Sequence, residues 1–293
     1  MGRLYLFLGA VFLFAPLDFA NAIVFFSQGN DANLTKPENG LPWENVVQMR
    51  SDSGPIGTGV YLGNRYVLTA GHVAPLTTVR IGFLDYALDS SVPYLVGTSD
   101  MKLVRLASDP GLGSVRLNTN PLNDGGYSYM VGYGVGRASG SLVNASPVTW
   151  GDASTSAKRW GTNLVDGAIS NAQVAGYTSD LLRTQFNSNA GGSEAALTIL
   201  DSGSALFRQI GSDWFLVGLG AYVQNSGYSL ASSQFNSSES DDNYFIRISS
   251  YAGSVQQIGT VLVPEPSTLG LLLGGGALWL VLALAHHAYQ SRS

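Results

Sequence analysis

Residues 200–204 read Leu-Asp-Ser-Gly-Ser and follow an apolar run over residues 195–199. A serine between an aspartate and a glycine, directly after an apolar run, is typical of a nucleophile on a tight turn. A serine hydroxyl is a poor nucleophile unless a neighbouring base takes its proton. If Ser202 is catalytic, the chain must therefore also supply a histidine and an orienting carboxylate. The alternative is a Ser/Gly turn between strands, which is common in a chain with 36 glycines.

Composition limits the kinds of site to expect. The 293 residues are 45% hydrophobic and 12% charged, with a net charge of −5 and no cysteine. No cluster of Lys and Arg is present, so we expect no nucleic-acid partner. Without cysteine there are no disulfides and no thiolate metal sites. Two of the three histidines, His286 and His287, lie near the C-terminus, so we expect no multi-histidine zinc site and no cofactor.

The body of the chain has the pattern of an all-β protein. Short apolar runs recur between residues 23 and 258, separated by turns rich in Gly, Asn, Ser and Pro, which predicts sandwiches or barrels. Turn signals over residues 107–125 divide the body into two halves, about 23–120 and 121–258. A short helix capped by Ser249 or Ser250 and ending near residue 258 is expected to close the second half.

His72 is the only histidine in the body of the chain, and it follows a strand-like run over residues 65–70. This places it just past the end of a buried strand, at the edge of a loop. A lone histidine is more often a packed or solvent-facing residue, but here no other is available to Ser202. Asp100 begins a second strand-like run, residues 100–106, where the simpler explanation is an ordinary aspartate in a turn.

The two ends of the chain have the patterns of targeting segments. Residues 1–22 have a basic start at Arg3, an apolar core over 4–14 and the small-x-small pattern Ala-Asn-Ala over 20–22, which predicts a signal peptide. The apolar core is too short to span a bilayer, so cleavage rather than anchoring is expected. The mature chain would then begin at Ile23, and the protein would be exported.

The C-terminal end is read as three short parts. Residues 259–268 form a linker that contains Pro-Glu-Pro, and residues 269–285 form an apolar run at the low end of spanning length. A buried core helix is the alternative for this run, but its position after a complete domain favours a transmembrane segment. Residues 286–293 would be a short cytoplasmic tail.

Three stretches together resemble the trypsin-like, or chymotrypsin-fold, serine peptidases. Residues 67–73 (Val-Leu-Thr-Ala-Gly-His-Val) are similar to the family's Leu-Thr-Ala-Gly-His motif. Residues 100–106 (Asp-Met-Lys-Leu-Val-Arg-Leu) are similar to Asp-Ile-Ala-Leu-Leu-Arg-Leu, and residues 200–204 resemble Gly-Asp-Ser-Gly-Ser. Residues 132–134 and 244–251 give weaker matches. The order His, Asp, Ser is the family's, and three motifs in order are more specific than any one of them.

The resemblance implies a fold and a chemistry for roughly residues 23–258. The fold would be two antiparallel β-barrels with a short C-terminal helix and an active site in the cleft between the barrels. His72 and Asp100 would come from the first barrel and Ser202 from the second, forming a triad that hydrolyses peptide bonds through an acyl-enzyme. The substrate would be a protein or peptide.

The resemblance also assigns an oxyanion hole to the backbone N–H groups of Leu200 and Ser202. The family has glycine where this chain has Leu200, whose Cβ restricts the backbone dihedrals open to it. Low activity, or a hole that forms only with substrate, is one expectation. It also implies that the amine of a new N-terminus at Ile23 pairs with Asp201, although Ile23 is as well explained as a plain strand start.

Substrate preference follows from four positions that align with the family's specificity pocket. The residue six before the serine is Ala196 rather than an acid, so a preference for Arg or Lys is not expected. The pocket wall would consist of Ala221, Tyr222 and Val223, and a valine there should make the pocket shallow. We expect small or medium apolar side chains before the cut.

The tail resembles a second family feature, the PEP-CTERM sorting signal, in which Pro-Glu-Pro precedes an apolar helix and a short positive end. This implies handling by an exosortase-type enzyme, a transient inner-membrane anchor, and delivery to the outer surface or extracellular matrix of a Gram-negative bacterium. A plain C-terminal anchor is the alternative. For the whole protein, the alternative to a peptidase is a non-catalytic or weakly active binding or matrix protein of the same fold.

Overall fold

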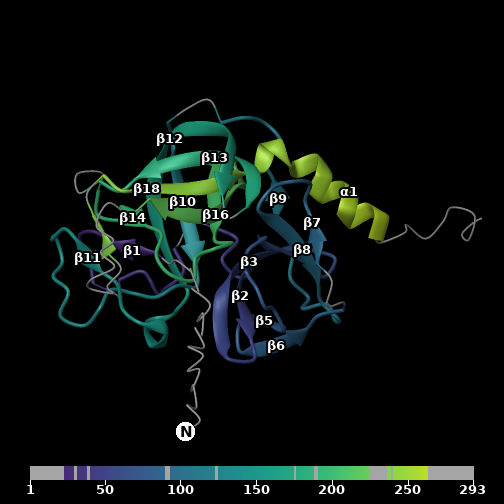
Figure 1. The fold of residues 1–293 in the computed structure, drawn as a ribbon, viewed down its shortest axis with the longest axis horizontal. Coiled ribbons are helices and arrows are strands. Elements are labelled where there is room, and N and C mark those ends of the chain that lie inside the picture. The colour runs from purple at the N-terminus through teal and green to yellow at the C-terminus, as the bar shows by residue number, and fades with distance from the viewer. Residues whose placement is uncertain are drawn as a thin grey trace, which may run out of the picture.

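The computed structural model describes residues 23–262, except for 30–31, 38–39, 90–92, 123–124, 175, 188–190, 225–235 and 239. The predicted signal peptide (1–22), transmembrane segment (269–285) and tail (286–293) lie outside the described residues. Figure 1 shows two groups of strands, one above the other, with the helix α1 (Ala252–Leu262) along one side. The all-β architecture predicted from the turn spacing is confirmed.

The first group is a seven-stranded antiparallel sheet in the order β6-β5-β2-β3-β4-β8-β7. Closure comes from a bridge between Leu88 and Leu106, which continue β6 and β8 and so join opposite sides of the sheet into a barrel. The strands are β2 (Val46–Ser51), β3 (Gly54–Gly63), β4 (Tyr66–Ala70), β5 (Thr78–Ile81), β6 (Leu84–Ala87), β7 (Tyr94–Leu95) and β8 (Met101–Arg105).

The second group closes on itself because β15 pairs with both β10 and β16. Six strands form the ring, in the order β15-β10-β12-β13-β18-β16, and β9 adds to β16 in parallel. The strands are β9 (Arg116–Leu117), β10 (Tyr127–Gly132), β12 (Arg159–Val174), β13 (Tyr177–Gln185), β15 (Ala205–Ile210), β16 (Asp213–Gln224) and β18 (Asp242–Arg247).

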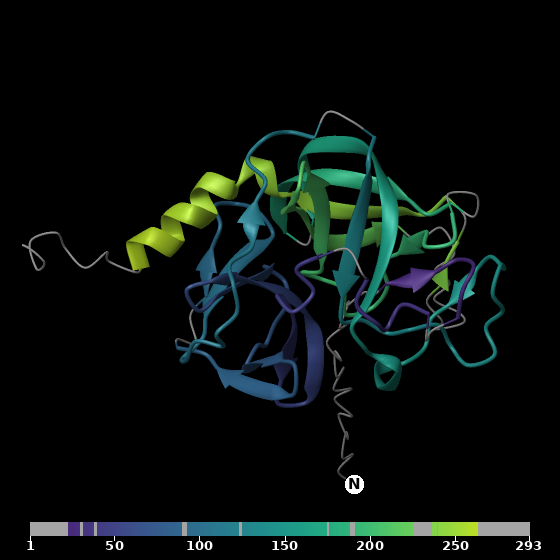
Figure 2. The ribbon, with the colours of Figure 1, turned by 180° about the vertical axis from the view of Figure 1, so that it is seen from behind.

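Two segments that the sequence analysis assigned to the first barrel pair with the second half of the chain. β1 (Val24–Phe25) pairs with β14 (Ala195–Ala196), seen in Figure 2 as a purple strand beside green ones. β9 pairs with β16. The barrel boundaries at residues 23 and 120 therefore need correction, because pairing partners far along the chain leave no local signal. A further short pair joins β11 (Val148–Thr149) to β17 (Asn236–Ser237).

One apolar cluster joins the two barrels. It contains Val46 and Leu68 of the first barrel together with Val131 and Phe207 of the second, all at most 1% exposed. Burying large aliphatic and aromatic side chains from both barrels in one cluster fixes their relative position, since each contributes roughly 1.5–3 kcal/mol. This shared cluster thereby holds the two barrels together.

The closing helix lies later in the chain than predicted. A 3-10 turn covers Ile248–Ser250, and α1 runs over Ala252–Leu262, four residues into the segment predicted as a linker from 259 to 268. Ala252 and Val255 of this helix pack on the inter-barrel cluster. Within the described residues, no helix has the length and apolar character needed to cross a membrane.

Candidate active site

Ser202 lies on a turn between β14 and β15, and that turn depends on the glycine after it. Gly203 has a φ of 85°, in the left-handed region that favours glycine. A Cβ at Gly203 would lie 2.1 Å from the carbonyl oxygen of Thr58, so no other residue fits without a backbone shift. The backbone N–H of Gly203 donates to Gly220 at 2.8 Å, which anchors the turn to β16.

His72 follows β4 and reaches Ser202 from the other barrel. Its Nε2 lies 2.8 Å from Oγ of Ser202, although the two residues are 130 positions apart in the chain. Its side chain is 21% exposed, so part of the imidazole is open to solvent. This is the distance at which an imidazole can remove a proton from a hydroxyl.

Asp100 holds the opposite side of the imidazole. Its Oδ2 lies 2.7 Å from Nδ1 of His72, and its Oδ1 accepts the backbone N–H of the same histidine at 2.9 Å. The carboxylate is fully buried. The backbone N–H of Asp100 donates to the hydroxyl of Ser179, at 2.9 Å, from β13. The structure therefore brings together the three residues that the sequence analysis selected.

Thr58 links the turn that carries Ser202 to the first barrel, and the sequence analysis did not single it out. Its hydroxyl donates to the carbonyl of Leu200 at 2.9 Å, and its backbone N–H donates to the carbonyl of Ser202 at 2.9 Å. The backbone N–H of Tyr133 donates back to that hydroxyl at 2.8 Å. A threonine in a strand carries no local sign of this role, because its partners are more than 70 residues away.

Leu200 adopts a backbone conformation that leucine rarely takes. Its φ is 80°, the left-handed region, which costs an ordinary residue roughly 1–2 kcal/mol. The Cβ restricts the dihedrals open to this residue, yet the structure has it in the conformation that glycine adopts readily. The side chain supplies the reason, since it is 6% exposed and packs with Val135 and Trp150 in a small apolar cluster.

Asp201 is fully buried, and neither of its carboxylate oxygens has a hydrogen-bond partner among the described residues. Burial raises the pKa of Asp201 well above its usual range, and the charge of Arg159 only partly opposes this. The carboxyl lies against Gly132, where a Cβ would approach Oδ1 to 1.8 Å. A buried acid without a partner is costly, so this group calls for an explanation.

Ile23 and Asp201 lie on neighbouring positions of one sheet face. Gly132 of β10 is paired with Arg159 of β12, and Gly161 is two residues further along β12, so both glycines face the same side. A Cβ on Gly161 would lie 3.2 Å from Cγ2 of Ile23, while Asp201 covers Gly132. The Cα atoms of diagonal neighbours on paired strands, such as Gly132 and Gly161, are about 7–8 Å apart.

The four predicted pocket residues are buried or half-buried. Ala196 is fully buried, pairs with Val24, and packs with Val148 and Phe186. Ala221 is 3% exposed, and Val223 packs against the core of the second barrel.

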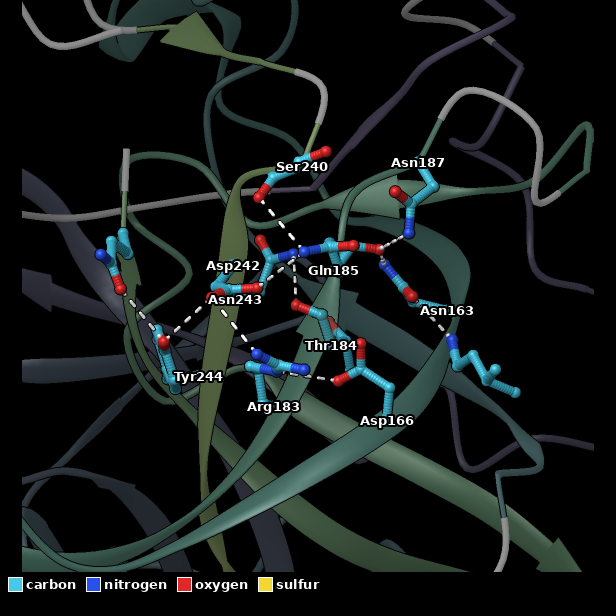
Figure 3. A network of polar contacts seen from close by, with 12 residues as sticks. Asn163, Asp166, Arg183, Thr184, Gln185, Asn187, Ser240, Asp242, Asn243 and Tyr244 are labelled. Carbon is cyan, nitrogen blue, oxygen red and sulfur yellow. Dashed lines mark hydrogen bonds and ion pairs between the residues drawn. The ribbon is translucent and has the colours of Figure 1, made fainter. Parts of the chain in front are cut away.

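Tyr222 stacks on Tyr244, with ring centroids 4.5 Å apart. Figure 3 shows polar groups around Tyr244, whose hydroxyl lies 3.1 Å from the side-chain oxygen of Gln224 and 3.1 Å from the carboxylate of Asp242. Arg183 lies 3.8 Å from Asp242 and donates to Asp166 at 3.0 Å. The surroundings of Tyr222 are thus more polar than the sequence indicated. Among the described residues, no group of His, Cys, Asp and Glu has the arrangement of a metal site.

Comparison with solved structures identifies the fold. Neuropsin, a serine protease of mouse brain, has a TM-score of 0.54 at 16% identity, over 78% of this chain and 98% of its own. A mutant of human heparin binding protein has a TM-score of 0.52 at 14% identity, over 80% and 98% of the two chains. An inactive mutant of Rv3671c from M. tuberculosis has a TM-score of 0.51 at 16% identity, over 82% and 97%.

At these identities the comparisons establish the fold, which is that of the trypsin-like serine proteases. No protein-family model matches the sequence, and no curated protein does either.

Proposed function

We propose that the protein is a serine endopeptidase in which Ser202 is the nucleophile. The observation that carries this proposal is the hydrogen-bonded series from Ser202 through His72 to Asp100, with contacts of 2.8 and 2.7 Å. A nucleophile within reach of a base that is itself oriented by a third group is the arrangement that activates a serine. A structural serine on a turn has no need of this second and third partner.

The chemistry follows from the geometry. Ser202 attacks the peptide carbonyl carbon while His72 takes its proton, and the same imidazole then protonates the leaving amine. Asp100 fixes the tautomer with a proton on Nδ1 and stabilises the imidazolium that forms. Water then enters by the same route, with His72 as its base, and releases the acyl group from Ser202.

The oxyanion of the tetrahedral intermediate would be bound by the backbone N–H groups of Leu200 and Ser202. Support comes from the conformation of Leu200, whose positive φ is one that glycine adopts readily, and from Thr58, which holds the carbonyl of Leu200. Each donor of this kind contributes about 3–4 kcal/mol to transition-state stabilisation. The proposal therefore treats Leu200 as a working substitute for glycine.

The amine of Ile23, released by signal-peptide cleavage, would be the partner of Asp201. The unpaired carboxyl and its position beside Ile23 on one sheet face support this pairing. A positive amine would compensate a buried carboxylate that otherwise remains costly. Arg137 supports the same arrangement, because its guanidinium donates to the carbonyls of Phe25 at 2.6 Å and Phe26 at 3.1 Å and so holds the strand that follows Ile23.

For substrates, we propose a preference for small or medium apolar side chains before the cut. The support is the neutral character of Ala196, Ala221 and Val223, none of which would bind a cationic side chain. A peptide-library profile checks this preference, and a profile dominated by Arg or Lys would exclude it.

Export and sorting also belong to the proposal, with the signal peptide and the Pro-Glu-Pro tail as their support. An exosortase-type enzyme would act on the tail, and the mature protein would lie on the outer surface or in the extracellular matrix of a Gram-negative cell. Deleting residues 263–293 should move the protein from the cell surface to the medium. An unchanged distribution between the two fractions contradicts the sorting role.

A second candidate is a non-catalytic or weakly active binding or matrix protein of the same fold. The observation that favours it is the strained Leu200 beside the nucleophile. A fluorophosphonate probe separates the two, because it reacts with an activated serine and leaves a structural serine unlabelled.

The proposed function predicts that the wild-type chain cuts casein and is labelled by the probe, and that Ser202→Ala loses both. The expected loss in kcat is roughly 10⁵- to 10⁶-fold, since the nucleophile and its base act as a unit. Ser128→Ala is the matched control, because Ser128 is also buried and its hydroxyl has no partner among the described residues. Casein cleavage at the wild-type rate by Ser202→Ala would exclude the proposal.

A further inference from the structure

Lys102 is a buried cation next to the triad. It lies in β8, two residues after Asp100, and is 4% exposed. The motif that residues 100–106 resemble has alanine at this position, so the lysine is a feature of this chain. A buried ammonium group is costly unless it is hydrogen-bonded or paired. Its contacts must therefore account for its presence.

The ammonium group binds the two residues that flank His72. Nζ donates to the carbonyl of Gly71 at 3.1 Å and also to the carbonyl of Val73. Asp100 holds the same loop, because its carbonyl accepts the N–H of Gly71 at 3.0 Å and its carboxylate accepts that of His72. Asp100, just before β8, and Lys102, within it, therefore bind His72 and both of its neighbours in the chain.

The charges around this loop are few. Burial lowers the pKa of Lys102, and the nearby carboxylate of Asp100 opposes that change. The strands on either side of Lys102 place the uncharged Thr69 and Leu95 opposite it. Among the described residues, Tyr177 is a further titratable group at this loop, and its hydroxyl would lie 3.2 Å from a Cβ on Gly71.

We propose that Lys102 is a positioning residue for His72, which holds the loop that carries the imidazole through the carbonyls on either side of it. This inference rests on the proposed function. The two hydrogen bonds fix the carbonyls before and after His72, so they set the direction in which its side chain leaves the backbone. The ammonium group and the imidazole have the carboxylate of Asp100 in common as a neighbour, so removing the ammonium charge changes the electrostatic surroundings of the imidazole.

Lys102→Met, which keeps the length of the side chain and removes both donors and the charge, tests the proposal. We expect kcat/KM to fall roughly 10- to 100-fold, as for other small misplacements of a reacting group. The acid limb of its pH profile should also move to higher pH, by about one pH unit, because the imidazolium loses a like charge nearby. A purely structural role would lower activity equally at all pH values.

Two further variants and a folding check keep the test interpretable. Lys102→Arg retains the charge, so its acid limb should stay at the wild-type position even if kcat falls. Lys158→Met is the matched control: Lys158 is a half-buried lysine over the rings of Trp43 and Tyr133, at 4.8 and 5.4 Å, and desolvation lowers its pKa to about 8. It should leave the acid limb unchanged. If Lys102→Met does not fold, as judged by its melting temperature, Lys102→Gln replaces it.

A readout that needs no activity separates this proposal from the proposed function. In the full chain labelled with ¹⁵N-histidine, NMR follows protonation of the imidazole of His72, and the His72→Gln spectrum identifies its signals among those of the three histidines. The titration midpoint should move to higher pH in Lys102→Met, even if the wild type proves inert towards casein and the probe. Wild-type midpoints in Lys102→Met, or an equal movement in Lys158→Met, overturn the positioning role.

Discussion

The two sides of the candidate site differ in how well their polar groups are satisfied. On the first-barrel side, both carboxylate oxygens of Asp100 are hydrogen-bonded, and both ring nitrogens of His72 have partners. On the second-barrel side, both oxygens of Asp201 and the hydroxyl of Ser204 are buried without partners among the described residues. Leu200 adds a strained φ of 80°.

This difference separates the part of the site whose buried polar groups are all hydrogen-bonded from the part where some have no partner among the described residues. Satisfied buried groups stabilise one geometry, so His72 and Asp100 are already held in the positions that the proposed mechanism requires. Unpaired buried groups and left-handed residues each cost on the order of 1–3 kcal/mol and persist only where the surroundings hold them. The nucleophile side is therefore the side that a new N-terminus or a substrate would stabilise.

Apart from removal of the hydroxyl of Ser202, the largest effect is expected on the first-barrel side. Asp100→Asn keeps the shape of the side chain but disturbs the tautomer of His72, so kcat should fall by about 10⁴-fold. Steady-state cleavage of casein or a peptide substrate measures this loss. A fall of less than tenfold would show that the hydrogen bonds of Asp100 serve the loop rather than the chemistry.

Intermediate effects are expected for Asp201→Asn. The substitution should be favourable for stability in a chain extended before Ile23 and unfavourable for activity in a chain that begins at Ile23. In a chain carrying one extra residue before Ile23, the carboxyl stays unpaired, and Asp201→Asn should stabilise the fold by roughly 1–3 kcal/mol at neutral pH. In the chain that begins at Ile23, the same substitution removes the partner of the amine, and kcat/KM should fall roughly 100-fold. Urea unfolding and steady-state kinetics check the two halves.

The stability of the extended chain should also depend on pH, because Asp201 is unpaired in that form. The pKa of Asp201 is raised in the folded state, so with rising pH the unfolded chain loses this proton first. Stability should therefore decrease as pH rises above about 4, the ordinary value for aspartate, and Asp201→Asn should remove that decrease. Equal activity of the extended and unextended chains would exclude the pairing of Ile23 with Asp201.

The smallest effect is the difference in stability between two substitutions at Leu200. Glycine usually destabilises a fold more than alanine does, but at this position we expect the opposite order. Both Leu200→Ala and Leu200→Gly lose the contacts with Val135 and Trp150, which should cost roughly 2–5 kcal/mol. Only glycine relieves the positive φ, so the glycine variant should be more stable than the alanine variant by about 1–2 kcal/mol. Melting temperatures decide the order, and an alanine variant as stable as the glycine variant would show that φ 80° is unstrained here.

Sequence reasoning predicted the parts of this protein that depend on short stretches. The turn at Ser202 needs a glycine next to it, and His72 needs a strand end before it, so both leave local patterns that can be recognised. The all-β class followed from the spacing of apolar runs and turns. The helix α1 was found but placed too early, because helix ends are fixed by packing on the inter-barrel cluster as much as by capping residues.

The tertiary structure alone decided how those parts meet. Contacts such as Thr58 to Leu200, 142 residues apart, or Lys102 to Gly71, across two strands, involve residue types with no local signature. Strand pairing also assigned residues 24–25 to the second half of the chain. The physical reason is that burial and hydrogen bonding between distant segments depend on the whole packed fold, whereas a turn or a strand depends on neighbours in the chain. Motif order thus determined which residues form the site, and packing determined which of them are satisfied and which are strained.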